Sequence, residues 1–264
     1  MPIKPAGTAT RLAVVAVAAL ALSSCSSTAT GSGSADTLTL IKAGALTVCT
    51  NPPYEPFESE KDGKVVGLDM SVVDEIAKDL NVKVETIVTP FEGIQSGEDL
   101  NSGKCDLVAS AITITAERKV KMDFSKPYFD ADQAVLVPAG SGIDSAAKLA
   151  GVKVGVQQTT TGETWAKKQG LTTAQFEDLG LEVEALRSGQ IDAAINDYAS
   201  LLPLANDKFV VGATFKTGEK YGLGAKKGNT VLLAKVNATL DRMTSDGTYD
   251  GIYKQFLGAA PTSS

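Results

Sequence analysis

Short apolar runs alternate with helical periodicity along the first half of the chain, and this order limits the possible folds more than any single motif. Residues 46–50, 82–88 and 106–109 have the apolar or alternating character of strands, and apolar residues recur at helical spacing from Asp69 onward. A further helix is expected over residues 90–100. The resulting β-α-β-α-β order is typical of a doubly wound parallel sheet.

A second pattern of strands and helices begins after residue 150. Strands are predicted over residues 152–156 and 191–195, and helices over 163–168 and 182–187. Thr161 is expected to cap the first of these helices. The last predicted elements are a strand over residues 221–225 and helices over 231–243 and 249–256. We therefore predict an α/β fold of two lobes that face each other across a cleft and close about a hinge.

Small and hydroxyl residues follow the apolar run Asp106–Ala109 directly, and the stretch Ser110–Arg118 ends in a single arginine. The open ends of buried strands face the ligand crevice in α/β sheets. Hydroxyl and free N–H groups there can bind an anion, and a guanidinium can hold a carboxylate through two hydrogen bonds. The stretch therefore predicts a carboxylate site, in a receptor for a small zwitterion.

The composition excludes several classes of function. The chain has 264 residues and a formal net charge of −6, so it lacks the basic field that attracts nucleic acid. It contains no histidine, which excludes Ser-His-Asp and Cys-His catalysis and histidine-ligated metal sites. The acidic residues show no metal-ligand spacing, so neither a metal site nor a cofactor is expected.

The first residues have the features of an export signal. Arg11 precedes the apolar run Leu12–Leu22, which is too short to span a membrane. The sequence Leu-Ser-Ser-Cys that ends at Cys25 looks like a bacterial lipobox, in which the cysteine becomes the lipid-bearing N-terminus. We predict a signal peptide over residues 1–24, and a lipidated Cys25 with a flexible tether over residues 25–37. An ordinary signal peptide with an incidental cysteine is the alternative.

Two further cysteines, Cys49 and Cys105, remain after the predicted cleavage. An even number of cysteines in an oxidising compartment indicates a disulfide. Cysteine also packs well as a small apolar residue, so two buried free thiols are the alternative. The sequence leaves both open.

Ordered motifs extend through most of the chain, from Leu38 to Gly258. The first are Cys49–Glu58 with Gly67–Asp69, and then Ala111–Arg118 with Asp123–Ser125 and Pro127-Tyr128. Later landmarks are Gly155-Val156, Ile191–Ala193, Tyr221-Gly222 and Asp246–Tyr249. Together these motifs resemble those of family 3 extracellular solute-binding proteins, the amino-acid receptors of ABC importers.

The resemblance implies an α/β, periplasmic-binding-protein-like fold, with two doubly wound lobes joined by a two-strand hinge and a ligand cleft between them. Lobe one would comprise residues 38–129 and 221–264, and lobe two residues 133–216. The hinge would lie near residues 129–133 and 216–221.

The resemblance also implies how the head group of an amino acid is held. Arg118 would bind the α-carboxylate, together with Thr113 and the backbone N–H groups near Ser110 and Ala111. Asp197 would bind the α-ammonium group. Without the motifs, Arg118 would be read as a solvated helix residue, and Asp197 as the cap of the following helix.

Other matched positions concern the ligand's side chain and the second lobe. Tyr54 and Phe91 match positions whose rings enclose the side chain. Thr160 and Thr161 resemble residues that reach the carboxylate from lobe two, where a helix N-terminus adds a partial positive charge. Core packing of the two rings and simple capping by the threonines are the alternatives, and Phe57 is expected in the core.

Three positions bear on which amino acid is bound. Asn51 replaces an aspartate that many members carry, and Ala111 replaces a serine common in the members for basic amino acids. Both changes argue against lysine, arginine and ornithine. Gln157 lies where side-chain specificity is often set, and its amide can pair with an amide or a hydroxyl. A polar, uncharged amino acid such as glutamine is therefore expected.

The resemblance implies a monomeric receptor, not an enzyme, anchored through Cys25 to the outer face of the bacterial cytoplasmic membrane. It would bind a free amino acid by hinge closure and deliver it to an ABC permease. A dehydratase-type enzyme on the same scaffold and a ligand-sensing lipoprotein for a membrane signalling partner are the alternatives. Without histidine, an enzyme would depend on an acid such as Glu55, Glu58, Glu92 or Glu163.

Overall fold

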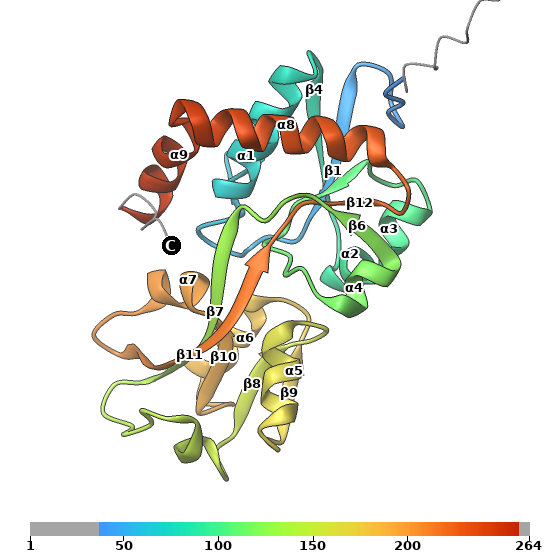
Figure 1. Cartoon of the computed structure of the whole chain (residues 1–264). Helices are drawn as coiled ribbons and strands as arrows, with labels where there is room; N and C mark the ends of the chain where they lie inside the picture. The colour runs from blue at the N-terminus through green and yellow to red at the C-terminus, as the bar shows by residue number, and fades with distance from the viewer. Residues whose placement is uncertain (1–36, 259–264) are drawn as a thin grey trace, which may run out of the picture. The chain divides into compact units, whose positions relative to one another are not determined.

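A computed structural model describes residues 37–258 of the chain. The predicted signal peptide and Cys25 lie outside the described residues, as does the predicted tether up to residue 36. Within the described part, no helix has both the length and the apolar character needed to cross a membrane. Figure 1 shows two α/β regions, each built around a five-stranded sheet.

The first sheet contains β1 (Ala45–Thr50), β4 (Lys83–Val88), β5 (Leu107–Val108), β6 (Met122–Phe124) and β12 (Gly224–Lys226). Its strand order is β4-β1-β5-β12-β6. β1 is parallel to β4 and β5, whereas β12 is antiparallel to β5 and β6. The helices are α1 (Leu68–Asp79), α2 (Phe91–Gln95), α3 (Glu98–Asn101), α4 (Ala116–Lys121), α8 (Thr230–Asp246) and α9 (Thr248–Leu257). All of β1 is buried, as expected for a central strand of a parallel sheet.

The second sheet contains β7 (Phe129–Pro138), β8 (Val154–Gln157), β9 (Thr173–Phe176), β10 (Ala193–Asp197) and β11 (Phe209–Tyr221). Its strand order is β11-β7-β10-β8-β9. β8 is parallel to β9 and β10, and β7 is antiparallel to β10 and β11. The helices are α5 (Thr161–Lys168), α6 (Leu179–Arg187) and α7 (Tyr198–Leu201), with short 3₁₀ turns at Ala146–Leu149 and Leu202–Leu204. A separate hairpin joins β2 (Ser59–Lys61) to β3 (Lys64–Val66).

The chain passes between the two sheets along β7 and β11, which Figure 1 shows side by side. These strands are antiparallel, with Phe129 opposite Tyr221 and Pro138 opposite Phe209. A register shift between Phe215 and Glu219 interrupts their ladder. The predicted hinge falls on this pair of strands, and the exact lobe boundaries stay a prediction.

The structure has the two α/β regions that the sequence pattern predicts, but it differs in local detail. The helix expected over residues 90–100 is two helices, α2 and α3, because Gly97 adopts a left-handed conformation (φ 74°) before α3. Thr160, not Thr161, caps α5, since its side chain accepts the N–H of Glu163. The pattern also misses β6, β9 and β11. β11 lies at the edge of its sheet and is only partly buried, so it has no continuous apolar run.

Cys49 and Cys105 form a disulfide, with their Cα atoms 5.7 Å apart. Cys49 lies in β1 and Cys105 shortly before the neighbouring strand β5. Both belong to a buried apolar cluster that includes Phe91 and Ile94 of α2. The structure therefore contains the disulfide and not the alternative, two buried free thiols.

Replacing both bridged cysteines by alanine should lower the free energy of unfolding by about 2–4 kcal/mol, because the bridge restricts a long loop of the unfolded chain. Denaturant unfolding of the oxidised wild type and of the double variant measures the difference. Reduced wild type is the matched control and should unfold like the variant. Equal midpoints for oxidised and reduced wild type would contradict the prediction.

Candidate ligand-binding site

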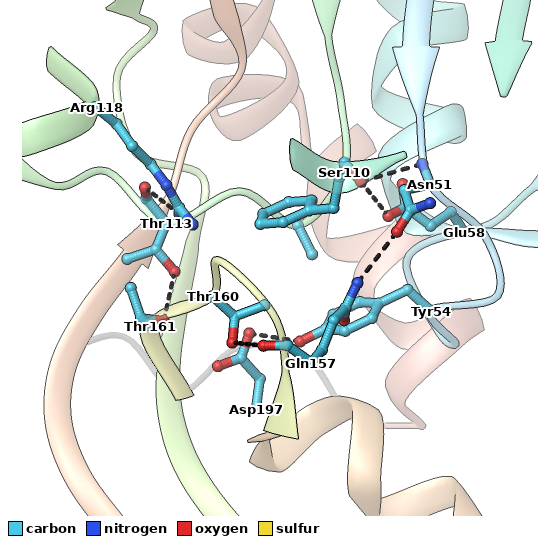
Figure 2. Close-up of a pocket in the computed structure, with 12 residues that line it drawn as sticks. Asn51, Tyr54, Glu58, Ser110, Thr113, Arg118, Gln157, Thr160, Thr161 and Asp197 are labelled. Atoms are coloured by element: carbon cyan, nitrogen blue, oxygen red, sulfur yellow. Dashed lines mark hydrogen bonds between the residues drawn. The ribbon is translucent and has the colours of Figure 1, made fainter. Parts of the chain in front are cut away.

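Twelve residues from the two sheet regions line one cavity (Figure 2). The lining includes every residue that the sequence predicts for ligand binding: Asn51, Tyr54, Phe91, Ser110, Ala111, Thr113, Arg118, Gln157, Thr160, Thr161 and Asp197. The remaining residue is Glu58, which the sequence indicates only as an acid for the enzymatic alternative. The structure therefore brings the predicted set together, while its role in binding stays a prediction.

Arg118 is fixed by the first turn of α4. Thr115 caps this helix, with its Oγ1 accepting the N–H of Arg118 at 3.1 Å. The guanidinium donates to the backbone oxygens of Thr113 (2.9 Å) and Thr159 (3.1 Å). Its Cζ lies 5.2 Å from the centre of the Phe91 ring, a cation–π distance. The side chain is thus held in one place by groups from both sheet regions.

The Arg118 guanidinium forms no ion pair with a carboxylate of the described residues. The residue is 4% exposed, and no ion pair within residues 37–258 includes it. Burial lowers its pKa to about 10, although the negative charges of Asp197 and Glu219 oppose this shift. It is therefore a buried cation at neutral pH, suited to receive an anion from a ligand.

Two residues at the cavity adopt left-handed backbone conformations that non-glycine residues rarely use, namely Ala111 (φ 42°) and Thr159 (φ 62°). Buried carboxylates hold both turns. Asp69 Oδ2 accepts the N–H of Ala111 at 2.7 Å, and Glu163 Oε2 accepts the N–H of Thr159 at 2.8 Å. Asp69 is therefore a buried acid that holds the turn at Ala111. Such conformations concentrate at ligand sites, where the surroundings can hold them.

Asp197 ends β10 and is 5% exposed. Its Oδ2 accepts hydrogen bonds from the hydroxyls of Tyr54 (2.7 Å) and Tyr221 (2.5 Å), and its Oδ1 accepts one from Gln133 Nε2. It precedes α7 but forms no capping hydrogen bond, so the capping alternative does not describe its side chain. Burial raises its pKa to about 6, while the tyrosine hydrogen bonds lower it. The carboxylate is thus an anion at neutral pH.

Amide and carboxyl groups gather at the side of the cavity away from Arg118 (Figure 2). Gln157 Nε2 donates to Asn51 Oδ1 at 3.1 Å. Ser110 Oγ donates to Glu58 Oε1 at 2.7 Å and accepts the N–H of Asn51 at 3.2 Å. Burial and the nearby charge of Asp69 raise the pKa of Glu58. No local pattern in the sequence distinguishes Glu58 from an ordinary loop acid, which is why its place in the cavity is missed.

Thr160 and Thr161 bring the N-terminus of α5 to the cavity. Thr160 Oγ1 accepts the N–H of Glu163 at 3.1 Å and donates to the backbone oxygen of Gln157 at 2.7 Å. Thr161 Oγ1 lies 3.4 Å from Thr113 Oγ1, which belongs to the first sheet region. Hydroxyl groups from both regions therefore meet beside Arg118, next to the partial positive charge of a helix N-terminus.

Glu182 of α6 lies behind this site and is fully buried. Its Oε2 accepts a hydrogen bond from Asn196 Nδ2 at 3.0 Å, and Asn196 Oδ1 lies 2.6 Å from the Tyr54 hydroxyl oxygen. Burial raises the pKa of Glu182 to about 8. The side chain is therefore mostly a neutral acid at pH 7.

The chain matches the bacterial extracellular solute-binding proteins, family 3, over residues 46–259. It is 33% identical over 221 residues to a probable histidine-binding protein of Neisseria gonorrhoeae, covering 80% of this chain and 82% of that one. It is 34% identical over 241 residues to the ABC transporter glutamine-binding protein GlnH of Bacillus subtilis (strain 168), covering 86% of both. Its fold matches that of an ancestral arginine-binding protein bound to glutamine, with a TM-score of 0.76 and 41% identity over 82% of this chain and 99% of that chain.

Replacing Glu182 with glutamine should stabilise the protein, and increasingly so as the pH rises from 5 to 8. In the unfolded chain Glu182 ionises near its ordinary pKa of 4.5, whereas the folded protein keeps it protonated to about pH 8. Folding therefore takes up a proton in this pH window. As a result, the free energy of unfolding of the wild type falls by about 1 kcal/mol per pH unit relative to that of the variant. Glutamine keeps an acceptor for Asn196 and does not titrate.

Denaturant unfolding across this pH range measures the difference between the Glu182→Gln variant and the wild type. Glu184→Gln is the matched control, because Glu184 lies on the same helix with its side chain 71% exposed, and it should leave the pH dependence unchanged. Parallel stability curves for wild type and Glu182→Gln would contradict the prediction.

Proposed function

Because this chain belongs to family 3 of the bacterial extracellular solute-binding proteins, we propose that it is an extracytoplasmic receptor that delivers a free amino acid to an ABC importer. One observation carries the proposal: a buried cation, Arg118, and a buried anion, Asp197, line the same cavity. A free amino acid carries the complementary charges on one head group.

In this proposal the α-carboxylate binds Arg118 through paired charge-assisted hydrogen bonds. The Thr113 hydroxyl and the N-terminus of α5 at Thr161 add donors from the two sheet regions. The α-ammonium binds Asp197, which the tyrosine hydroxyls already hold in place. Both charges then act in a site shielded from water, where charge pairs are stronger than at the surface.

A polar, uncharged side chain fits the other side of the cavity. The Asn51 and Gln157 amides bond to each other there, and a carboxamide on the ligand can both donate to and accept from such groups. Burial and the charge of Asp69 raise the pKa of Glu58, which disfavours a negative charge that could attract a basic side chain. Glutamine is the favoured ligand, with the Tyr54 and Phe91 rings against its aliphatic carbons.

Calorimetry on refolded, ligand-free protein should give L-glutamine the lowest Kd among the twenty amino acids, and the ligand should be recovered unchanged. Arg118→Met should weaken binding about 100-fold, because it removes the only buried guanidinium of the described site from the carboxylate. Lys119→Met, on an exposed neighbour in α4, is the matched control and should have little effect.

Three outcomes would contradict parts of this proposal. Tightest binding to arginine or lysine would overturn the side-chain assignment. Unaltered affinity in Arg118→Met would overturn the head-group assignment. Conversion of the ligand would favour the dehydratase-type alternative.

We also propose that Cys25 carries a lipid that anchors the mature receptor to the outer face of the cytoplasmic membrane. The sequence before it supports this, because a short apolar run ends in Leu22-Ser23-Ser24. Cys25→Ser should release the protein from the membrane fraction and abolish labelling by a radioactive fatty acid. Ser27→Ala should keep both. Unchanged labelling of Cys25→Ser would contradict the proposal.

A further inference from the structure

Gln133 lies where the second sheet meets the strand pair that connects the two sheets. It belongs to β7, is 0% exposed, and is opposite Asp197 of β10 on one side and Phe215 of β11 on the other. The register shift of β11 begins next to it, so that Glu219 is the next residue of β11 paired with β7.

The shifted segment of β11 is held by the residue before Gln133. Asp132 Oδ1 accepts the backbone N–H groups of Thr217 (2.9 Å) and Gly218 (3.3 Å). Gly218 adopts a left-handed conformation (φ 67°), which glycine tolerates at little cost. This arrangement places the Glu219 side chain within reach of the Gln133 amide.

The Gln133 amide connects two carboxylates. Its Nε2 donates to Asp197 Oδ1 and to Glu219 Oε2 (3.0 Å), and it lies 3.3 Å from Thr161 Oγ1. Thr161 Oγ1 also donates to Glu219 Oε2 at 3.1 Å. The opposite amide orientation would turn an oxygen toward both carboxylates, so the electrostatics fix the orientation.

Without this amide, no side chain of the described residues would donate to both Asp197 and Glu219. The negative charge of Glu219 already raises the pKa of Asp197, and the hydrogen bond from Gln133 lowers it. A like charge disfavours ionisation, whereas a hydrogen bond to the charged form favours it. The amide therefore opposes the effect that Glu219 has on Asp197.

We infer that Gln133 is a positioning residue for ligand binding, whose amide holds the Asp197 carboxylate in place at the cavity and joins it to Glu219 at the register shift of β11. The inference rests on the proposed role of Asp197 as the partner of the ligand's ammonium group. It adds a residue outside the cavity lining, acting through a carboxylate that lines it.

Several charged or titratable groups face Asp197 besides Glu219: Tyr54 after β1, Tyr221 at the end of β11, Arg118 of α4 and Glu182 of α6. Burial raises the pKa of both tyrosines, so they donate as neutral phenols across the tested pH range. Arg118 stays cationic there. The charge of Asp197 helps to keep Glu182 protonated over most of this range, so Glu219 is the charged acid that faces Asp197, and it is bonded to Gln133.

Gln133→Met tests the inference, because methionine has a similar length but no donor. The Kd of L-glutamine, or of whichever of the twenty amino acids binds most tightly, is measured by calorimetry between pH 5 and 8. The wild type should lose affinity as Asp197 is protonated at falling pH. In Gln133→Met, the pH midpoint of this loss should rise by about one unit, so that binding should weaken about tenfold at pH 5 but only about twofold at pH 7.

Two further variants separate positioning from mere packing. Glu219→Gln removes the repelling charge, so it should lower the midpoint in the wild type and reverse much of the rise in Gln133→Met. Gln169→Met, at an exposed position at the end of α5, is the matched control and should keep the wild-type midpoint. Circular dichroism checks that each variant is folded.

An unchanged midpoint in folded Gln133→Met would overturn the inference, as would a Glu219→Gln variant that titrates like the wild type. If Gln133→Met does not fold, the pH midpoint of the single variant Glu219→Gln tests the inference alone, and a midpoint equal to that of the wild type would overturn it. In each of these cases the proposed function still holds, provided that the wild type binds an amino acid. A wild type that binds none of the twenty amino acids overturns the proposed function itself, and the inference with it.

Discussion

The site depends on burying Arg118 and Asp197 within one cavity without pairing either with a charged residue of the described chain. A buried, unpaired charge costs several kcal/mol unless hydrogen bonds or a partner compensate it. Here neutral groups compensate in part: backbone oxygens accept from Arg118, while two phenols and an amide donate to Asp197. A zwitterionic ligand would supply the missing charges, so its binding would relieve a cost already present in the fold.

The topology explains how distant residues reach one cavity. Asn51 and Ser110 follow the parallel strands β1 and β5, whereas Gln157 and Asp197 end the parallel strands β8 and β10. Carboxyl ends of parallel strands meet at one edge of a sheet, and this edge is where α/β sheets bind ligands. Each sheet therefore contributes polar groups at its own edge, and contacts such as Tyr54 with Asp197 connect the two sets.

The sequence predicts which residues line the cavity better than it predicts the local structure around them. Residues such as Arg118 and Asp197 lie in short motifs next to apolar runs, so they can be located without knowledge of the fold. Glu58, Gln133 and Glu219 cannot be found in this way, because their roles depend on partners 52 to 86 residues away in the chain. The same reason hides the register shift of β11, which is set by side-chain contacts with β7. The helix break at Gly97 and the cap at Thr160 are one-residue details that periodicity does not resolve.

The central claim is that the two buried charges recognise the head group of a free amino acid. Titrating the wild type with L-glutamine, its α-amide and its N-acetyl derivative tests this directly, because each analogue lacks one head-group charge and keeps the side chain. We predict that each loss weakens binding about 100-fold or more, since a buried partner is left unpaired. Equal affinity for glutamine and either analogue would show that the corresponding charge of the cavity does not bind the ligand, and would contradict the account.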